Sequence, residues 1–199
     1  MNSKVKNFVI NICIIVVIVL IIGIGYIIFK KYYGNHKNEQ DISNFISENY
    51  DNLDDDSNNE KQNLEYKGYK VLGIIKIPKI DLNYPIIDPL NKKDEALNIS
   101  IIKFAGGTIN DFGNVTLAGH NYYDTTMFAK LHFLNISDKI EIVDNKNKSL
   151  IYEVYKKYNV SPNDTSIVES NDKSIKEITL ITCTKGNSER LVIKAKEVN

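Results

Sequence analysis

Residues 175–196 read Ile175-Lys-Glu-Ile-Thr-Leu-Ile-Thr-Cys183-Thr-Lys-Gly-Asn-Ser-Glu-Arg190-Leu-Val-Ile-Lys-Ala-Lys196. Two runs rich in β-branched and apolar residues flank a polar loop that contains a glycine, which predicts strands at 175–182 and 191–196 in a hairpin-like pair. Cys183 lies where the first strand opens into the loop, and Arg190 lies where the second strand begins. Of the 25 Lys and Arg residues, only Arg190 is an arginine, which indicates a task for a planar, bidentate donor.

The chain from about Tyr66 onward has the same character as this hairpin. Short β-branched and aromatic runs alternate with turn residues, which predicts an all-β barrel or sandwich. Pro85 lies inside the second run, so we expect an edge or bent strand there. Helical spacing predicts two short helices, at 91–97 and 126–134. The remaining predicted strands are 71–77, 82–87, 114–118, 139–143 and 150–158.

His120 is a second candidate for chemistry, because it follows the predicted strand 114–118 at another strand end. A thiol nucleophile needs a base or cation to form its thiolate, and acyl transfer also needs a donor for the developing oxyanion. Cys183, His120 and Arg190 supply these roles. Each residue alone also has a simpler interpretation: an inert thiol, a loop histidine, and a surface ion pair of Arg190 with Glu189 or Asp172.

The N-terminal run 8–29 has no charged residue and is long enough to span a bilayer. It is followed directly by Lys30 and Lys31 without a small-residue cleavage site, so we expect an uncleaved transmembrane anchor behind a tail of residues 1–7. Lysines flank the run on both sides, and the positive-inside rule therefore does not fix its orientation. Cys13, within the run, is expected to be a membrane-facing thiol.

Residues 30–65 are expected to form an acidic linker, and residues 66–199 the folded domain. Nine acidic residues face only Lys37 and Lys61 between positions 34 and 65, and such a stretch resists collapse. Ile42, Phe45, Ile46, Asn49/Tyr50 and Leu53 recur at helical spacing, so a short amphipathic helix could lie on the domain or on another protein. We expect a transient helix in the linker instead.

The overall formal charge of zero hides this acidic linker beside a mildly basic domain. No element clusters basic residues, so no nucleic-acid partner is expected. No Cys or His pair has ligand spacing either, so neither a metal nor another cofactor is expected.

The run Thr179-Leu-Ile-Thr-Cys183 resembles the TLxTC signature of sortases, the membrane-anchored cysteine transpeptidases of Gram-positive bacteria, and matches all four defined positions. The resemblance extends from about Leu72 to the C-terminus. It includes Thr116-Leu-Ala-Gly-His120 and Arg190-Leu-Val-Ile, in the family's order and spacing. The class is uncertain, with a lean toward class D.

The resemblance implies an eight-stranded β-barrel with short helices. It implies that Cys183 cleaves an LPxTG-like sorting signal through a thioester and that an amine of a peptidoglycan precursor resolves it, which anchors a surface protein to the cell wall. His120 would be the acid/base partner, Arg190 would hold the oxyanion, and Thr182 and Ala118 would contact the substrate. The amino terminus would be cytoplasmic and the domain extracellular, with one membrane pass.

Two rival hypotheses stay open at this point. A papain-like cysteine hydrolase would use the same residue types without transfer, but its nucleophile usually precedes the histidine and begins a helix. The other rival is a non-enzymatic membrane-tethered β-domain in which Cys183 belongs to the core.

Overall fold

The structure is a computed structural model that describes residues 3–50, 64–122, 126–169, 172–184, 186 and 188–198. It divides into two compact units, Met1–Asp41 and Ile42–Asn199. Helix α1, Ser3–Asn49, makes up the described part of the first unit and continues into the second. Its segment Ile10–Lys30 has a mean hydropathy of 3.3 and is long and apolar enough to cross a membrane.

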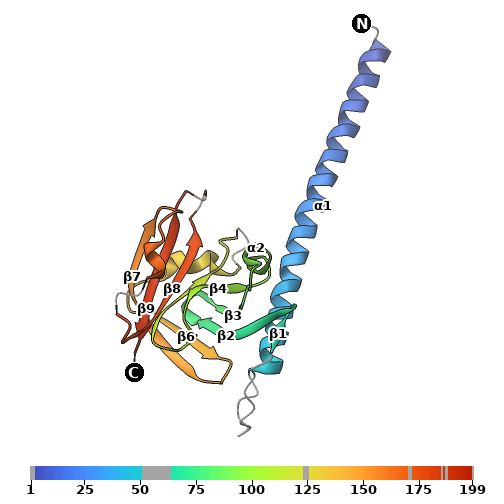
Figure 1. The fold of residues 1–199 in the computed structure, drawn as a ribbon. Helices are drawn as coiled ribbons and strands as arrows, with labels where there is room; N and C mark the ends of the chain where they lie inside the picture. The colour runs from blue at the N-terminus through green and yellow to red at the C-terminus, as the bar shows by residue number, and fades with distance from the viewer. Residues whose placement is uncertain are drawn as a thin grey trace. The chain divides into compact units, whose positions relative to one another are not determined.

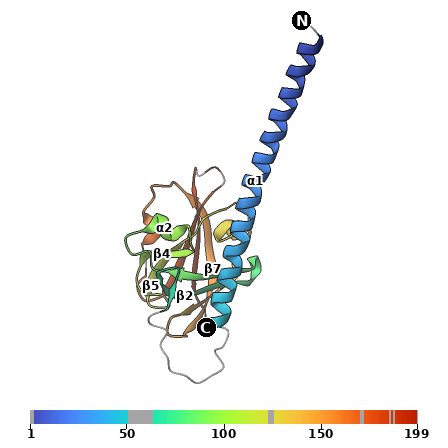
Figure 2. The same ribbon diagram turned by 90° about the vertical axis from the view of Figure 1, so that its right-hand side faces the viewer.

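The second unit is an all-β barrel with short helices (Figure 1). Eight strands follow one another in the order β2-β3-β4-β5-β8-β9-β7-β6, and β6 pairs with β2, which closes the barrel. Figure 2 shows the same strands after a quarter turn. The strands are β1 (Glu65–Tyr66), β2 (Tyr69–Ile77), β3 (Leu82–Ile87), β4 (Ile101–Gly106), β5 (Gly113–Ala118), β6 (Lys139–Asp144), β7 (Ser149–Val160), β8 (Lys176–Cys183) and β9 (Arg190–Glu197). The helices of this unit besides the end of α1 are η1 (Pro78–Ile80), α2 (Lys93–Leu97), η2 (Phe128–Phe133) and η3 (Ser166–Val168).

The closing seam of the barrel depends on Gly73. This residue pairs with Asp144 of β6, and a Cβ atom built on it would lie 2.5 Å from the carbonyl oxygen of Val143. Any side chain would push β2 and β6 apart, so the seam needs a glycine. Closure leaves β2 and β6 paired on both sides, while the two-residue β1 adds to β2 outside the barrel.

The seven predicted strands are confirmed, and two strands were missed. β4 lacked a clear signal because only Ile101 and Ile102 are buried, whereas the next three residues are partly exposed. The expectation of an edge strand at Pro85 was wrong, since β3 pairs with both β2 and β4. The pairing with β4 begins only at Ile86, and the carbonyl of Pro85 instead accepts the hydroxyl of Ser100 at 2.6 Å. Proline is tolerated because β4 does not reach it.

The end of α1 packs against the barrel, so the prediction of a transient linker helix was wrong. Ile42, Ile46 and Tyr50, spaced four residues apart on one helix face, are each at most 2% exposed. The ring of Phe45 lies 4.9 Å from that of Tyr66 in β1. Leu53 lies outside the described residues. The expected boundaries at residues 7, 29 and 65 stay predictions, although the compact unit already includes Ile42.

Candidate active site

The hairpin of β8 and β9 places Cys183 opposite Arg190. The two residues are register partners in an antiparallel pair, so their side chains lie on the same face of the sheet. Hydrogen bonds between Thr184 and Glu189 close the connecting loop. The backbone N–H of Thr184 donates to the carbonyl of Glu189 at 3.0 Å, and the N–H of Glu189 donates to Thr184 Oγ1 at 3.2 Å. The two side chains therefore leave the sheet next to each other.

The guanidinium of Arg190 is half-buried and has no carboxylate partner within the described residues. Its Nη1 donates only to the carbonyl of Glu189, at 3.4 Å. The carboxylate of Glu189 accepts a hydrogen bond from Asn159 at 2.9 Å instead. The surface ion pair considered as the simpler role of Arg190 is thus not formed, and most of its donors stay available to a bound molecule.

His120 reaches the same end of the barrel through β5. This strand runs parallel to β8, and their last register pair is Ala118 with Ile181, so His120 and Cys183 each follow two residues later. The N–H of Gly119 donates to the carbonyl of Ile181, and the carbonyl of His120 accepts the N–H of Phe128 at 3.0 Å. The fold therefore brings the three predicted residues together from three strand ends.

The imidazole of His120 is partly shielded from solvent. Burial lowers the pKa of His120 below its ordinary value, and the negative charge of Asp94 in α2 opposes this effect. The ring of Tyr122 lies 4.7 Å away, and its hydroxyl donates to Asn98 at 3.3 Å. Because burial dominates, the neutral imidazole is favoured at pH 7, which suits a group that accepts a proton.

Two side-chain hydrogen bonds also fasten the His120 segment to the strand that carries the thiol. Asn121 Nδ2 donates to the carbonyl of Cys183 at 2.7 Å, and Thr182 Oγ1 donates to the carbonyl of Gly119 at 2.7 Å. Sequence reasoning missed Asn121, whose only signal was its place beside His120. Thr182 and Ala118 are both buried at this end, and their substrate contacts stay predictions.

Gly119 sets the path of the chain into His120. A Cβ atom on this residue would lie 2.9 Å from two ring carbons of Phe128, the first residue of η2. Phe128 is fully buried, so its ring has little room to move. The missing side chain lets the backbone before the histidine pack directly on the core.

The remaining candidates lie elsewhere. His132 is exposed in η2, and its Nδ1 lies 2.9 Å from the carbonyl oxygen of Ala129. Cys13 is exposed on α1 in the first unit. Within the described ranges, no group of three His, Cys, Asp or Glu side chains is arranged to hold a metal ion. His120 and Cys183 are thus the pair around which chemistry must be sought.

Comparison with known proteins gives a consistent assignment. The model of the Sortase domain matches residues 75–198. Sortase A of Bacillus anthracis is 28% identical over 197 residues, covering 90% of this chain and 91% of its own. The structure of Sortase A from Corynebacterium diphtheriae matches with a TM-score of 0.58 and 29% identity, over 66% of this chain and 62% of that one.

A structure of a Clostridium perfringens Sortase D5 transpeptidase matches with a TM-score of 0.62 and 25% identity, over 81% of this chain and 98% of that one. The closed eight-stranded barrel agrees with both structural matches. The family match spans more than half of the chain, and it contains every residue of the candidate site. The chain therefore belongs to the sortase family and is a cysteine transpeptidase.

Proposed function

We propose that this enzyme cleaves LPxTG-like sorting signals of surface proteins and transfers them to an amine of a peptidoglycan precursor. The observation that carries the proposal is the pairing of Cys183 with an Arg190 that has no carboxylate partner among the described residues, beside the strand end that bears His120. This arrangement supplies a nucleophile, a permanent cation for an oxyanion, and a titratable imidazole.

In the first step Cys183 Sγ attacks the carbonyl carbon of the threonine in the signal. His120 takes the thiol proton as the S–C bond forms, and it gives this proton to the leaving amine as the Thr–Gly C–N bond breaks. Arg190 stabilises the negative charge on the tetrahedral oxygen. In the second step the acceptor amine attacks the thioester and loses a proton to His120 as the new C–N bond forms. The sulfur leaves with the electron pair of the C–S bond and regains that proton from His120.

The apolar segment of α1 supports a single-pass membrane anchor. An amino terminus in the cytoplasm and a barrel outside are proposed from membership of the sortase family. Thr182 and Ala118 are proposed to support substrate binding, since both are buried beside the site. A class D-like assignment has support from the Clostridium perfringens Sortase D5 structure, nearly all of which is matched.

Intact-mass spectrometry of the full chain in detergent micelles tests this function. The chain is incubated with LPxTG-type peptides varied at each position, and an acyl adduct on Cys183 is expected. Cys183→Ala should lose the adduct, whereas Cys13→Ala, which removes the other thiol, should keep it. Discharge by an added amine, with a new amide as product, is the expected second step.

Two results would refute the proposal in different ways. Discharge by water alone, with no amide formed at high amine concentration, would indicate a hydrolase. A thiol that labels only after unfolding, with no adduct from any peptide, would indicate a structural cysteine. The partial exposure of Cys183 argues against the second result.

A further inference from the structure

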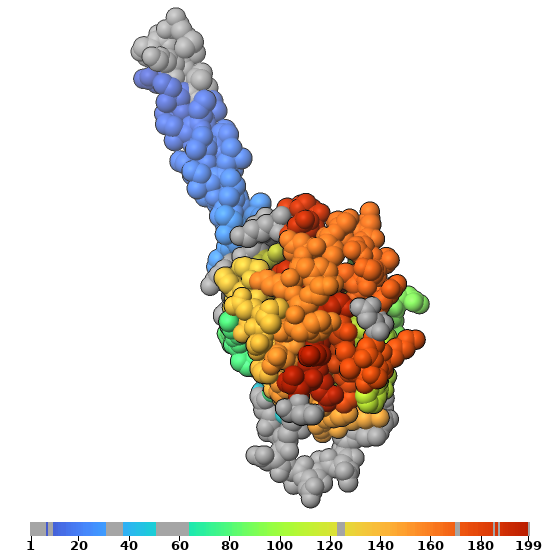
Figure 3. Space-filling model, turned by 90° about the vertical axis from the view of Figure 1, so that its left-hand side faces the viewer, coloured from blue at the N-terminus to red at the C-terminus, as the bar shows by residue number. Residues whose placement is uncertain are grey.

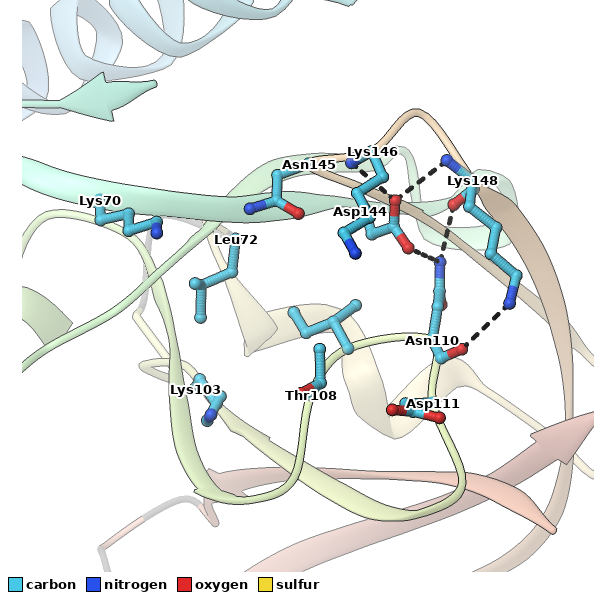
Figure 4. A pocket seen from close by; sticks show the side chains of 11 residues that line it. Lys70, Leu72, Lys103, Thr108, Asn110, Asp111, Asp144, Asn145, Lys146 and Lys148 are labelled. Carbon is cyan, nitrogen blue, oxygen red and sulfur yellow. Dashed lines mark hydrogen bonds between the residues drawn. The ribbon is translucent and has the colours of Figure 1, made fainter. Parts of the chain in front are cut away.

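A cavity of about 580 Å³ opens beside the turn between β6 and β7 (Figure 4). Its walls come from the start of β2, from Lys103 and the loop between β4 and β5, and from the turn between β6 and β7. No lining residue belongs to the site described above. The loop residues of the lining precede β5, whereas His120 follows its end, and Lys103 pairs with Leu117 near that end. The cavity has the volume of an ordinary small-molecule pocket.

The wall of this cavity is firmly built around Asn110, which is 4% exposed. Its Nδ2 donates to the carbonyls of Ile142 at 3.0 Å and Lys148 at 2.7 Å, and its Oδ1 accepts the hydroxyl of Tyr152 at 3.0 Å. One buried amide thereby joins the β4–β5 loop to β6 and β7. The cavity is preformed rather than dependent on a mobile side chain.

Four lysines and two carboxylates line the cavity. The carboxylates already have partners in the backbone. Asp144 Oδ1 accepts the N–H groups of Lys146 at 2.9 Å and Lys148 at 3.0 Å, and Asp111 Oδ1 accepts the N–H of Phe112 at 2.8 Å. Neither carboxylate forms an ion pair with a lysine in the described part of the chain.

The cations, in contrast, are largely without partners. Lys148 Nζ donates to the carbonyl of Asn110 at 3.4 Å. The ammonium groups of Lys70, Lys103 and Lys146 form no hydrogen bond or ion pair with any residue that the structure describes. Figure 4 shows Lys70 and Lys103 on two sides of the hollow, from β2 and β4. Three partnerless ammonium groups from three segments surround one cavity, so its lining favours an anion.

We propose that this cavity binds a ligand that carries two or more phosphate groups. Ammonium groups act on phosphate oxygens as point charges and need no planar geometry, whereas carboxylate recognition favours the arginine fork that is missing here. A volume of about 580 Å³ leaves room for more than one phosphate group among these cationic side chains. The site is separate from the thiol, so the proposal does not rest on the proposed transpeptidation.

Isothermal titration of the full chain in uncharged detergent micelles with inorganic tripolyphosphate tests the proposal. One bound ligand per chain is expected, with an affinity that falls as salt rises, because the Debye length shortens from about 30 Å at 0.01 M to about 8 Å at 0.15 M. No binding at low salt would overturn the proposal.

Matched variants locate the binding. The double variant Lys70→Gln/Lys103→Gln should weaken binding about tenfold or more, because each charged contact contributes strongly. Lys130→Gln/Lys156→Gln removes the same charge outside the cavity and should leave the affinity within about twofold. Equal losses in the two variants would show a diffuse charge effect and refute the site. The thermal unfolding midpoint confirms that each variant is folded.

Asp111→Asn should change the affinity for tripolyphosphate in the opposite direction. The amide keeps an acceptor for the N–H of Phe112 but removes a negative charge from the lining, so binding of tripolyphosphate should tighten. Unchanged or weaker binding would contradict the proposal, since a structural role for the lysines predicts no gain.

Two further titrations identify the source of the phosphates. A soluble oligomer of glycerol phosphate that competes with tripolyphosphate would indicate a phosphodiester polymer. Competition only by micelles doped with an anionic phospholipid would indicate lipid headgroups. Competition by either ligand supports the phosphate site if Lys70→Gln/Lys103→Gln abolishes that competition. If neither the oligomer nor the doped micelles compete, the proposal is overturned for natural phosphates.

Discussion

Two cations on β9 lie on the same face of the sheet but differ in burial and in ion pairing. Arg190 lies opposite Cys183, half-buried, without a carboxylate partner in the described part of the chain. Lys194, four residues later, is 8% exposed at its side chain, and its Nζ donates to Glu177 at 2.7 Å. The hydroxyl of Tyr155 donates to the same carboxylate at 3.1 Å. One charge is satisfied within the fold, and the other is left for a ligand.

The difference shows where this hairpin is structural and where it is functional. A buried charge persists only if it is paired, so Lys194 and Glu177 depend on each other. Burial, and then the nearby carboxylate of Glu177, also raise the pKa of Tyr155 well above its usual range, which keeps this donor protonated. Arg190 does not need a counter-ion in this way, because its side chain is partly exposed to solvent. Figure 3 shows the surface of the barrel that β7, β8 and β9 form, in orange and red.

The largest effect is expected from breaking the structural pair. Glu177→Gln keeps the shape of the side chain but leaves the Lys194 charge buried without a counter-ion, which should lower the free energy of unfolding by about 3 kcal/mol. Urea denaturation of the full chain in micelles measures this change. Glu141→Gln, at a partly exposed site bonded to Ser149, should stay within about 0.5 kcal/mol. If Glu177→Gln were as stable as the wild type, the Lys194 ammonium would have to be hydrated in the variant.

The next largest effect is expected at the functional cation, and on rate rather than on stability. Arg190→Lys keeps the charge but loses the planar fork, so the rate of acylation of Cys183 should fall about 100- to 1,000-fold. Rapid-quench mass spectrometry measures this rate, and the unfolding free energy should barely change. A near-normal rate would remove Arg190 from the oxyanion role.

A smaller effect is expected from the hydrogen bond that joins the His120 segment to β8. Asn121→Ala loses the donor to the carbonyl of Cys183, worth about 1 kcal/mol, and the acylation rate should fall up to about tenfold while the peptide KM changes little. Asn135→Ala removes an exposed asparagine outside the site and serves as the control. Equal rates for the two variants would assign Asn121 a purely structural role.

The smallest effect concerns the titration of His120. Asp94→Asn removes the charge that partly offsets burial, so the pKa of His120 should fall further below 6.5. The Cε1 proton resonance of His120, followed by NMR, measures this shift. Glu95→Gln is the matched control, because Glu95 pairs with Lys92 at 3.3 Å. A rise in the pKa of His120 in Asp94→Asn would contradict this account.

The same shift links stability to pH. The unfolded chain binds the proton of His120 more tightly than the folded chain does, so stability is complete above pH 6.5 and declines as pH falls through the lower folded pKa. Asp94→Asn should enlarge this loss. Unfolding curves between pH 5 and about pH 7.5 test the sign.

Much of this protein could be predicted from local sequence. Alternating β-branched runs gave seven strands, and the positions of Cys183, His120 and Arg190 at strand ends gave the candidate site before the barrel was known. These features depend on neighbours within a few residues, where side-chain periodicity and turn residues act directly. The apolar run in α1 is equally local, since only length and composition define it.

Only the tertiary structure decided which contacts these segments make. β4 pairs with β3 on one side and with β5 on the other, and these pairings define it as a strand. Pro85 is tolerated because the pairing with β4 begins after it. The helix end at Ile42 and Ile46 packs on the barrel, and Asn121 meets Cys183 although 62 residues separate them. Non-local pairing and burial are set by the arrangement of whole strands, and no window of sequence contains that information. The sequence alone therefore determined the elements and the reactive side chains, whereas barrel closure decided which charges were left available for a ligand.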